Sequence, residues 1–361
     1  MQRCLPNAPE HTLEEFFKIA KGILKRGHAV MGIGPRGIGK TERTAKLAEE
    51  MGLVYVPFIL GHKEKSDLLI PRFDPITGSI VEYPLGSLKL GVTTPALVHI
   101  DEFNRTEDSL QSALLTIVNE RRIGDFVFAP GTCFVMTGNP PDHAGANQPL
   151  DTLIGRAWCA HIKADLGEVR AYLTRLGVEG STERMLGVDI AATAASRPDL
   201  IAIEPPDGAE NGALYPQPRQ VVYAIQDAAA YVDGGGQISD PAVMSILSGR
   251  MGRETAAALT TLWRMRDKLP TVEEIVKSPD TAKLPSDMES GVAALGLVAM
   301  AHKAGKQGVN SAWIYTGRLP QRDIQNALGR ALLGQIPTDA GALKVHHKLI
   351  GQAGAMLSGN F

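Results

Sequence analysis

Cysteine is scarce in this chain. Its three cysteines, Cys4, Cys133 and Cys159, are odd in number and far apart in the sequence. This number and spacing exclude a disulfide-stapled scaffold and a zinc finger. No apolar run approaches the roughly 18 residues that a membrane span requires, and residues 1–17 lack the basic-then-apolar layout of a secretory signal peptide. We therefore expect the protein in a reducing cytoplasm, without membrane insertion.

The sequence also lacks a surplus of charge of either sign. It has 37 Lys and Arg residues and 39 Asp and Glu residues, which gives a net charge of −2. General binding to a phosphate backbone needs a basic surplus, so a nucleic-acid coat protein is disfavoured, although a local basic groove remains open. Hydrophobic residues make up 44% of the 361 residues, an ordinary value for a globular protein long enough for two or three domains.

Helical and strand-like patterns alternate in the first half of the chain. The predicted elements are, in order, a helix over 11–25, a strand over 29–31, a helix over 40–51, strands over 53–60 and 95–100, a helix over 106–119 and a strand over 133–137. Strands that alternate with helices predict an α/β fold with a mainly parallel sheet in three layers.

The second half is rich in alanine and has no strand alternation. Helices are predicted over residues 168–176, 220–232, 242–251, 254–268, 290–303 and 321–333. Residues 201–218 contain four prolines, which is typical of a linker or an exposed loop.

A phosphate-binding loop is the strongest chemical signal. The motif G-x-x-x-x-G-K-[ST] is matched in full by Gly34, Pro35, Arg36, Gly37, Ile38, Gly39, Lys40 and Thr41, and Glu42 follows it. The motif comes after a predicted strand and opens a predicted helix, where backbone N–H groups and the helix N-terminus can hold phosphates. Lys40 can reach the β- and γ-phosphates of ATP, and the Thr41 hydroxyl can bind Mg²⁺.

A dinucleotide-binding fingerprint overlaps this loop. Gly32, Gly34 and Gly37 fit G-x-G-x-x-G, which requires an acidic residue at the end of the next strand. The strand predicted over 53–60 ends without a carboxylate, so this interpretation is set aside.

Two acidic residues end the strand predicted over 95–100. Asp101 would hold the shell of a Mg²⁺ ion, and Glu102 would act as the general base that polarises the attacking water. A strand that ends in two acidic residues is common by chance. The phosphate loop upstream on the same predicted sheet is what makes this strand end a strong signal. His99 lies within the same strand and is interpreted as a hydrogen-bonded core residue.

A polar amide follows the strand predicted over 133–137. If that strand lies beside the one ending in Asp101, Asn139 would point at the γ-phosphate and could position the water. The alternative is a simple Asn-Pro turn with Pro140.

Together these motifs resemble AAA+ ATPases of the MoxR family. The resemblance covers about residues 10–270 and rests on the segments GPRGIGKT, HIDEFNR, TGNPP, LIGR and QPRQ, in that order. Less universal features agree: Ser66-Asp67-Leu68-Leu69, the form Asp101-Glu102-Phe103-Asn104-Arg105, and the stretch from Ala113 to Arg121.

The resemblance implies further roles by position. Asn139 would be the sensor 1 residue, and Arg219 the sensor 2 arginine at the start of a lid helix. Arg156 would be the finger that reaches the nucleotide of the next subunit, although Ala157 follows it where the family usually has Phe. Arg105 and Arg121 are alternatives for this finger.

The implied protein is a ring, with a hexamer expected, that hydrolyses ATP with Mg²⁺ and remodels a protein partner. The family's usual partner carries a von Willebrand factor A domain. The implied domains are an α/β nucleotide-binding domain over 1–200, a helical lid over 201–275 and a helical extension over 276–361.

Two other functions compete with this interpretation. A nucleic-acid motor or loader can be built on the same core, but the sequence offers neither a zinc module nor a basic cluster beyond short pairs. A degenerate ATPase that binds nucleotide only as a structural switch is disfavoured by the intact Lys40, Asp101, Glu102 and Asn139.

Overall fold

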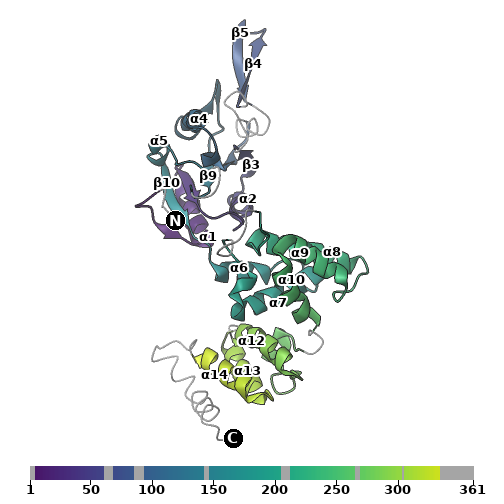
Figure 1. The fold of residues 1–361 in the computed structure, drawn as a ribbon. Helices are drawn as coiled ribbons and strands as arrows, with labels where there is room; N and C mark the ends of the chain where they lie inside the picture. Colours follow the sequence, from purple (N-terminus) through teal and green to yellow (C-terminus); the bar gives the residue numbers. More distant parts are fainter. Residues whose placement is uncertain are drawn as a thin grey trace, which may run out of the picture. The chain divides into compact units, whose positions relative to one another are not determined.

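The computed structural model describes residues 5–60, 68–84, 93–141, 146–204, 212–264, 269–302 and 305–333. The chain divides into two units, Met1–Glu168 and Val169–Phe361 (Figure 1). Some predictions lie outside the described residues: those on Ser66 and Asp67, residues 205–211 of the predicted linker, and 334–361 of the predicted extension.

A six-stranded sheet forms the centre of the first unit. Its strands are β1 (Glu10–His11), β2 (Ala29–Ile33), β3 (Val54–Ile59), β6 (Ala96–Asp101), β9 (Cys133–Gly138) and β10 (Ala157–Ile162). Their order across the sheet is β1-β10-β2-β9-β6-β3, and every neighbouring pair is parallel. The predicted α/β fold is confirmed, and the strands that end in Asp101 and before Asn139 are direct neighbours.

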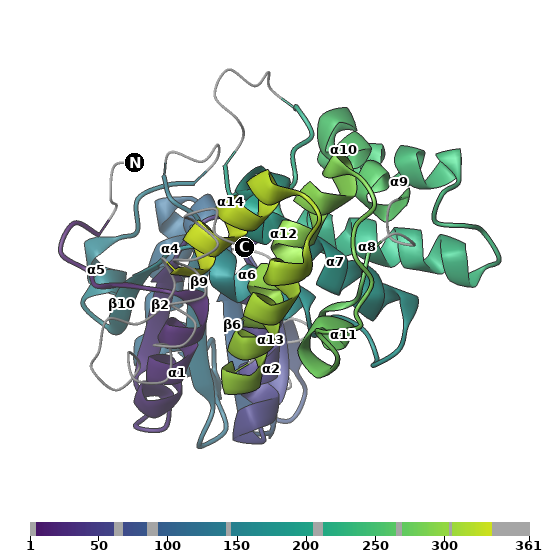
Figure 2. The ribbon, with the colours of Figure 1, turned by 90° about the horizontal axis from the view of Figure 1, so that it is seen from below.

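Helices cover both faces of this sheet. One apolar cluster joins the sheet to α1 (Leu13–Leu24) and α2 (Lys40–Met51), which lie side by side in Figure 2. A second cluster joins the opposite face to α4 (Asp108–Asn119) and α5 (Asp151–Ile154). Strand β2 contributes to both, because Val30 packs on the first face while Met31 and Ile33 pack on the second. The three predicted layers are therefore present.

Local signals set the ends of the helices that flank the phosphate loop. Thr12 and Glu15 form a reciprocal capping box at the start of α1. Gly39 (φ 93°) precedes helix α2 and Gly52 (φ 66°) follows it, and both glycines have the left-handed conformation that residues with a Cβ avoid. The predicted bounds of α2, residues 40–51, are confirmed.

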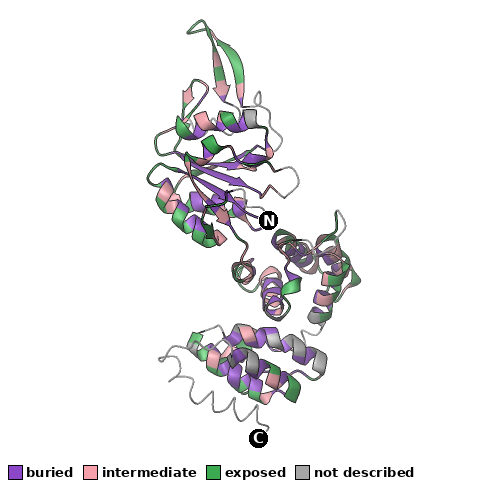
Figure 3. Ribbon diagram, turned by 60° about the vertical axis from the view of Figure 1, so that its left-hand side comes forward, coloured by how far each residue is buried: buried purple, intermediate pink, exposed green. Residues whose placement is uncertain are grey.

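Two hairpins between β3 and β9 were not predicted. The longer one pairs β4 (Leu69–Asp74) with β5 (Ser79–Pro84), and the shorter pairs β7 (Arg122–Ile123) with β8 (Phe126–Val127). They meet where the rings of Tyr83 and Phe126 lie 5.1 Å apart. Most of the longer hairpin is exposed or half-buried (Figure 3). Its outer part carries exposed apolar side chains: Phe73 is 68% exposed, Ile76 in the turn 93% and Ile80 70%.

The second unit is helical in its described residues. Helix α6 (Leu166–Leu173) crosses the boundary between the units, and the helices that follow it are α7 (Thr182–Ser196), α8 (Pro218–Asp233), α9 (Pro241–Met251), α10 (Arg253–Arg264), α11 (Val272–Lys277), α12 (Met288–His302), α13 (Gly305–Arg318) and α14 (Arg322–Leu333). All six predicted helices are found, whereas α7, α11 and α13 were not predicted. The domain boundaries at residues 200 and 275 stay predictions.

Close packing of α7 on α12 joins the early and late helices of this unit. A Cβ atom built on Gly296 would lie 2.4 Å from the carbonyl oxygen of Ala192, so only glycine permits this approach. The adjoining apolar cluster includes the fully buried Trp313 and Tyr315 of α13. Within the described residues, none of the helices is both long and apolar enough to span a membrane.

Candidate nucleotide site

The loop between β2 and α2 places the phosphate-binding motif at the carboxyl edge of the sheet. Gly37 (φ 75°) and Gly39 both have positive φ, which bends the loop in a way that glycine permits. Gly34 donates its N–H to the Gly138 carbonyl (3.2 Å), and a Cβ atom on Gly34 would lie 2.4 Å from the carbonyl oxygen of Ile162. The loop is thus fixed between β9 and β10.

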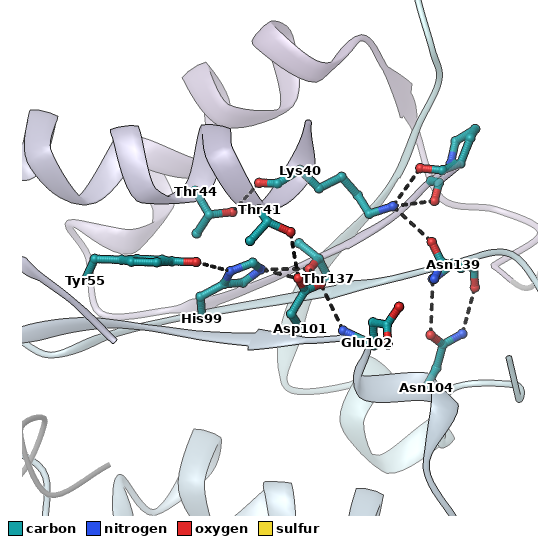
Figure 4. A network of polar contacts seen from close by, with 12 residues as sticks. Lys40, Thr41, Thr44, Tyr55, His99, Asp101, Glu102, Asn104, Thr137 and Asn139 are labelled. Atoms are coloured by element: carbon teal, nitrogen blue, oxygen red, sulfur yellow. Dashed lines mark hydrogen bonds and ion pairs between the residues drawn. The ribbon is translucent and has the colours of Figure 1, made fainter. Parts of the chain in front are cut away.

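Lys40 points into this loop and is only 8% exposed (Figure 4). Its Nζ donates to the carbonyl oxygens of Gly34 (2.7 Å) and Pro35 (2.8 Å), and to Oδ1 of Asn139 (3.2 Å). The ammonium therefore joins the phosphate loop to the residue that follows β9. Two of the predicted site residues are brought together here.

Asp101 lies at the end of β6 and accepts hydrogen bonds on both oxygens. Thr41 donates to Oδ2 (2.7 Å), while Thr137 (2.6 Å) and the Glu102 N–H (2.9 Å) donate to Oδ1. Burial opposes ionisation, but the charge of His99, these hydroxyl donors and the charge of Lys40 together lower the pKa of Asp101. Since His99 is neutral near pH 7, the hydroxyls and Lys40 hold Asp101 ionised there.

A chain of hydrogen bonds supports Asp101 from within the core. Thr137 donates to the carboxylate, so its oxygen accepts from Nε2 of His99 (2.8 Å), and Nδ1 of His99 accepts from the Tyr55 hydroxyl (2.8 Å). This order requires a neutral imidazole. Burial lowers the pKa of His99 to about 4 against the opposing effect of Asp101, and burial raises the pKa of Tyr55 to about 12. The predicted core role of His99 is confirmed, and its contact with the site through Thr137 was not foreseen.

Glu102 directly follows β6 and has a strained backbone. Its φ of 54° and ψ of 34° are left-handed, a conformation that is uncommon for residues with a Cβ and frequent at functional sites. Its carboxylate accepts from NH1 of Arg105 at 3.1 and 3.2 Å, and both side chains are partly exposed.

Asn104 holds Asn139 in place and was not recognised as a functional residue from the sequence. Its fully buried side chain accepts from the Asn139 N–H (3.2 Å) and donates to the carbonyl oxygens of Asn139 (2.8 Å) and Asn147 (3.0 Å). A Cβ atom on Gly138 would lie 2.4 Å from Oδ1 of Asn104, so this close fit depends on glycine. Its sequence signal was its place in the segment Asp101-Glu102-Phe103-Asn104-Arg105, which supports the family resemblance but assigned no role to Asn104.

The phosphate loop, the carboxylates and Asn139 all lie within a region that matches a known family. Residues 29–156 match the model described as AAA domain (dynein-related subfamily). This part of the chain is an AAA domain.

Matches to whole proteins are distant. No curated protein matches the sequence. The Thermotoga maritima RuvB Holliday junction branch migration motor is 12% identical over 74% of each chain, with a TM-score of 0.37. A proposed ATPase from Cytophaga hutchinsonii is 15% identical over 93% of this chain and 88% of that one, with a TM-score of 0.36. Identities and scores this low give no information on function.

Arg156 is the last residue of the region that matches the AAA domain. It lies at the amino-terminal end of the strands, whereas Lys40 lies at their carboxyl end. It directly precedes β10, whose first residue is level with Ala29 at the start of β2, so five residues of strand, about 16 Å, separate it from the phosphate loop. Arg156 is exposed and donates to the Thr152 carbonyl (3.0 Å). It lines an open hollow of about 600 Å³ together with Trp158. The structure does not bring Arg156 to the nucleotide site of its own chain.

The other predicted arginines have different surroundings. Arg121 (φ 55°) donates to the carbonyl oxygens of Gly27 (2.8 Å) and Thr132, and its guanidinium lies 5.4 Å from the centre of the Phe134 ring. Arg219 belongs to the second unit and is exposed in the first turn of α8.

The described residues contain no group of three or more His, Cys, Asp or Glu side chains that could form a metal-binding cluster. The hydroxyl of Thr41 and the carboxylate of Asp101 nevertheless fit a hard cation that takes few protein ligands and keeps waters or phosphate oxygens, as Mg²⁺ does.

Proposed function

We propose that this protein hydrolyses ATP with Mg²⁺. One observation carries the proposal: at the carboxyl ends of the neighbouring strands β2, β9 and β6, the first residues of α2 contact the residues that end or follow the other two strands. Lys40 donates to Asn139, and Thr41 donates to Asp101. Backbone N–H groups of residues 36–41 would hold the phosphates, with Glu42 next to them in the first turn of α2. Binding would turn the Lys40 ammonium from the loop carbonyls towards the β- and γ-phosphates.

The other residues have roles in positioning and proton transfer. Thr41 and Asp101 would hold Mg²⁺, which when bound neutralises charge on the phosphate oxygens. Glu102 would accept the proton of the attacking water, and Asn139 would orient that water.

We further propose that the protein works as a homo-oligomeric ring of the MoxR type, expected to be a hexamer. Arg156 is exposed at the edge away from its own Lys40, as a residue that serves the next subunit must be. Arg219 lies in the first turn of a helix, where the helix dipole disfavours a cation, so an anionic partner such as a phosphate would suit it. The ring would remodel a protein partner, with a von Willebrand factor A domain as the expected type.

Subunit mixing tests hydrolysis and assembly together. Glu102→Gln should bind ATP but turn over roughly 100-fold more slowly, the range expected for loss of a positioned base. Arg156→Ala should also be inactive alone, and mixing the two variants should restore activity, because an intact Arg156 then faces an intact Glu102. Arg175→Ala is a matched control, since exposed Arg175 likewise donates to the carbonyl four residues earlier.

Three outcomes would contradict the proposal. Normal turnover of Glu102→Gln would place the base elsewhere. Activity of wild-type protein that does not depend on its concentration would contradict the ring. Strong, salt-sensitive stimulation by DNA would favour the nucleic-acid motor instead.

A further inference from the structure

The pair formed by Glu102 and Arg105 has a geometry that bears on catalysis. A single nitrogen of Arg105, NH1, lies 3.2 Å from Oε1 and 3.1 Å from Oε2 of Glu102. It therefore sits across the open end of the carboxylate, where lone pairs of both oxygens converge. A water molecule would have to use the same end to give its proton to the more basic side of the carboxylate.

The backbone holds these two residues at a fixed spacing. The Arg105 N–H donates to the Glu102 carbonyl (3.0 Å) across the 3₁₀ turn η2 (Phe103–Arg105), and Asp101 accepts the Glu102 N–H. Phe103 and Asn104 within the turn are fully buried. The turn is thus anchored in the core, and the pair can open only by movement of the two side chains.

Partial exposure makes such an opening easy. The side chains of Arg105 and Glu102 are 27% and 29% exposed, so water can replace each partner. Ion pairs of this kind are weak. The pair can therefore hold Glu102 while the site is idle without preventing its use.

We propose that Arg105 is a positioning residue that occupies the proton-accepting end of Glu102 and restrains hydrolysis until the pair opens. This inference rests on the proposed ATP hydrolysis. It also separates Arg105 from a finger that acts on the neighbouring subunit, because removal of a finger lowers turnover whereas removal of a restraint raises it.

Steady-state ATP hydrolysis by Arg105→Gln and Arg105→Lys tests the proposal. Arg105→Gln should raise kcat about two- to fivefold, the factor that corresponds to a partly exposed ion pair, while KM for ATP stays unchanged. Arg105→Lys keeps the charge and should stay near the wild-type rate. Loss of a purely structural contact would not raise kcat.

Two controls complete the experiment. Arg197→Gln removes another short-range pair, with Asp199 at 2.7 Å, and should leave kcat unchanged. In the Glu102→Gln background, Arg105→Gln should give no gain, because the group it restrains is absent.

The outcomes separate this inference from the function on which it rests. If the wild-type protein hydrolyses no ATP, the proposed function fails. If the wild type is active and Arg105→Gln is equally active or slower, or if the gain persists in the Glu102→Gln background, the restraint is overturned while the ATPase stands.

Discussion

Most polar side chains of a folded protein are exposed and most large apolar ones are buried. The nucleotide site and the β4–β5 hairpin depart from this distribution in opposite ways. At the carboxyl edge of the sheet, polar groups such as His99 and Asn104 are fully buried, and each has hydrogen-bond partners. On the hairpin, Phe73 and Ile80 face each other across the two strands and remain mostly exposed. A buried polar group is destabilising unless its hydrogen bonds are made, so it requires one particular arrangement of its neighbours. An exposed apolar side chain requires no particular arrangement of its neighbours. Substitutions should therefore have large effects at the site and small effects on the hairpin.

The largest effect is expected for Lys40→Ala. Removal of the ammonium should weaken ATP binding roughly 100-fold, since hydrogen bonds to charged phosphates are strong. Titration calorimetry with a slowly hydrolysed ATP analogue measures this. Lys21→Ala, which removes a surface pair with Glu50, is the control. Binding by Lys40→Ala within threefold of wild type would contradict the phosphate-loop assignment.

The buried network should also make stability depend on pH. The pKa of His99 is lowered from 6.5 to about 4 in the folded protein, so the unfolded chain binds more protons between these values. Stability should therefore fall as pH drops from about 6.5 to 4, by about 3 kcal/mol from this group. The lowered pKa of Asp101 acts in a lower window, because its contribution is lost only as pH falls below its ordinary value of 3.8.

Urea unfolding of metal-free protein across this pH range measures the effect. His99→Gln should flatten the pH dependence, and exposed His28→Gln should leave it as in the wild type. An equally steep dependence in His99→Gln would mean that other groups carry it.

A smaller loss of stability is expected for Asn104→Ala. The substitution leaves the Asn139 N–H and two carbonyl oxygens without their side-chain partner, which should cost about 2 kcal/mol. Chemical denaturation followed by far-UV circular dichroism measures this. Asn119→Ala, at an exposed position at the end of α4, should change stability by less than about 0.5 kcal/mol. Equal effects of the two substitutions would remove Asn104 from the site's support.

The smallest effect is expected on the hairpin. Phe73→Ala should change the free energy of unfolding by less than about 0.5 kcal/mol, whereas Phe134→Ala, on buried β9, should cost about 3 kcal/mol or more. Thermal unfolding compares them directly. A large loss of stability from Phe73→Ala would mean that the hairpin is a folding element, and the contrast between the two regions would disappear.

Much of the site could be predicted because its chemistry is local in sequence. The glycines and Lys40 stand in one loop, and Asp101 and Glu102 follow one another, so spacing alone predicts what they can contact. The position of Asn139 beside Lys40 required one further step, the adjacency of β6 and β9, which a parallel sheet made reasonable.

The missed features depend on contacts between segments far apart in sequence. Strand β10 is mostly half-buried and lacks a clean alternation, so its pattern gave no strand signal. Helix α13 carries two glycines in its first turn and owes its stability to the burial of Trp313 and Tyr315. The hydrogen bonds between the Asn104 side chain and the Asn139 backbone join residues 35 positions apart in the sequence, and no spacing rule predicts them.

The hydrogen bonds that run from Tyr55 through His99 and Thr137 to Asp101 all point in one direction, so the row of donors has a polarity. It ends on Oδ1, which also receives the Glu102 N–H, and this oxygen is thereby saturated. Oδ2 has a single hydroxyl neighbour, Thr41, whose rotation can release it. The two oxygens of this carboxylate are therefore not equivalent. Oδ1 is fully used by hydrogen bonds from the protein, whereas Oδ2 can bind another group once Thr41 turns away. A cation arriving at this edge of the sheet would meet Asp101 through one oxygen only.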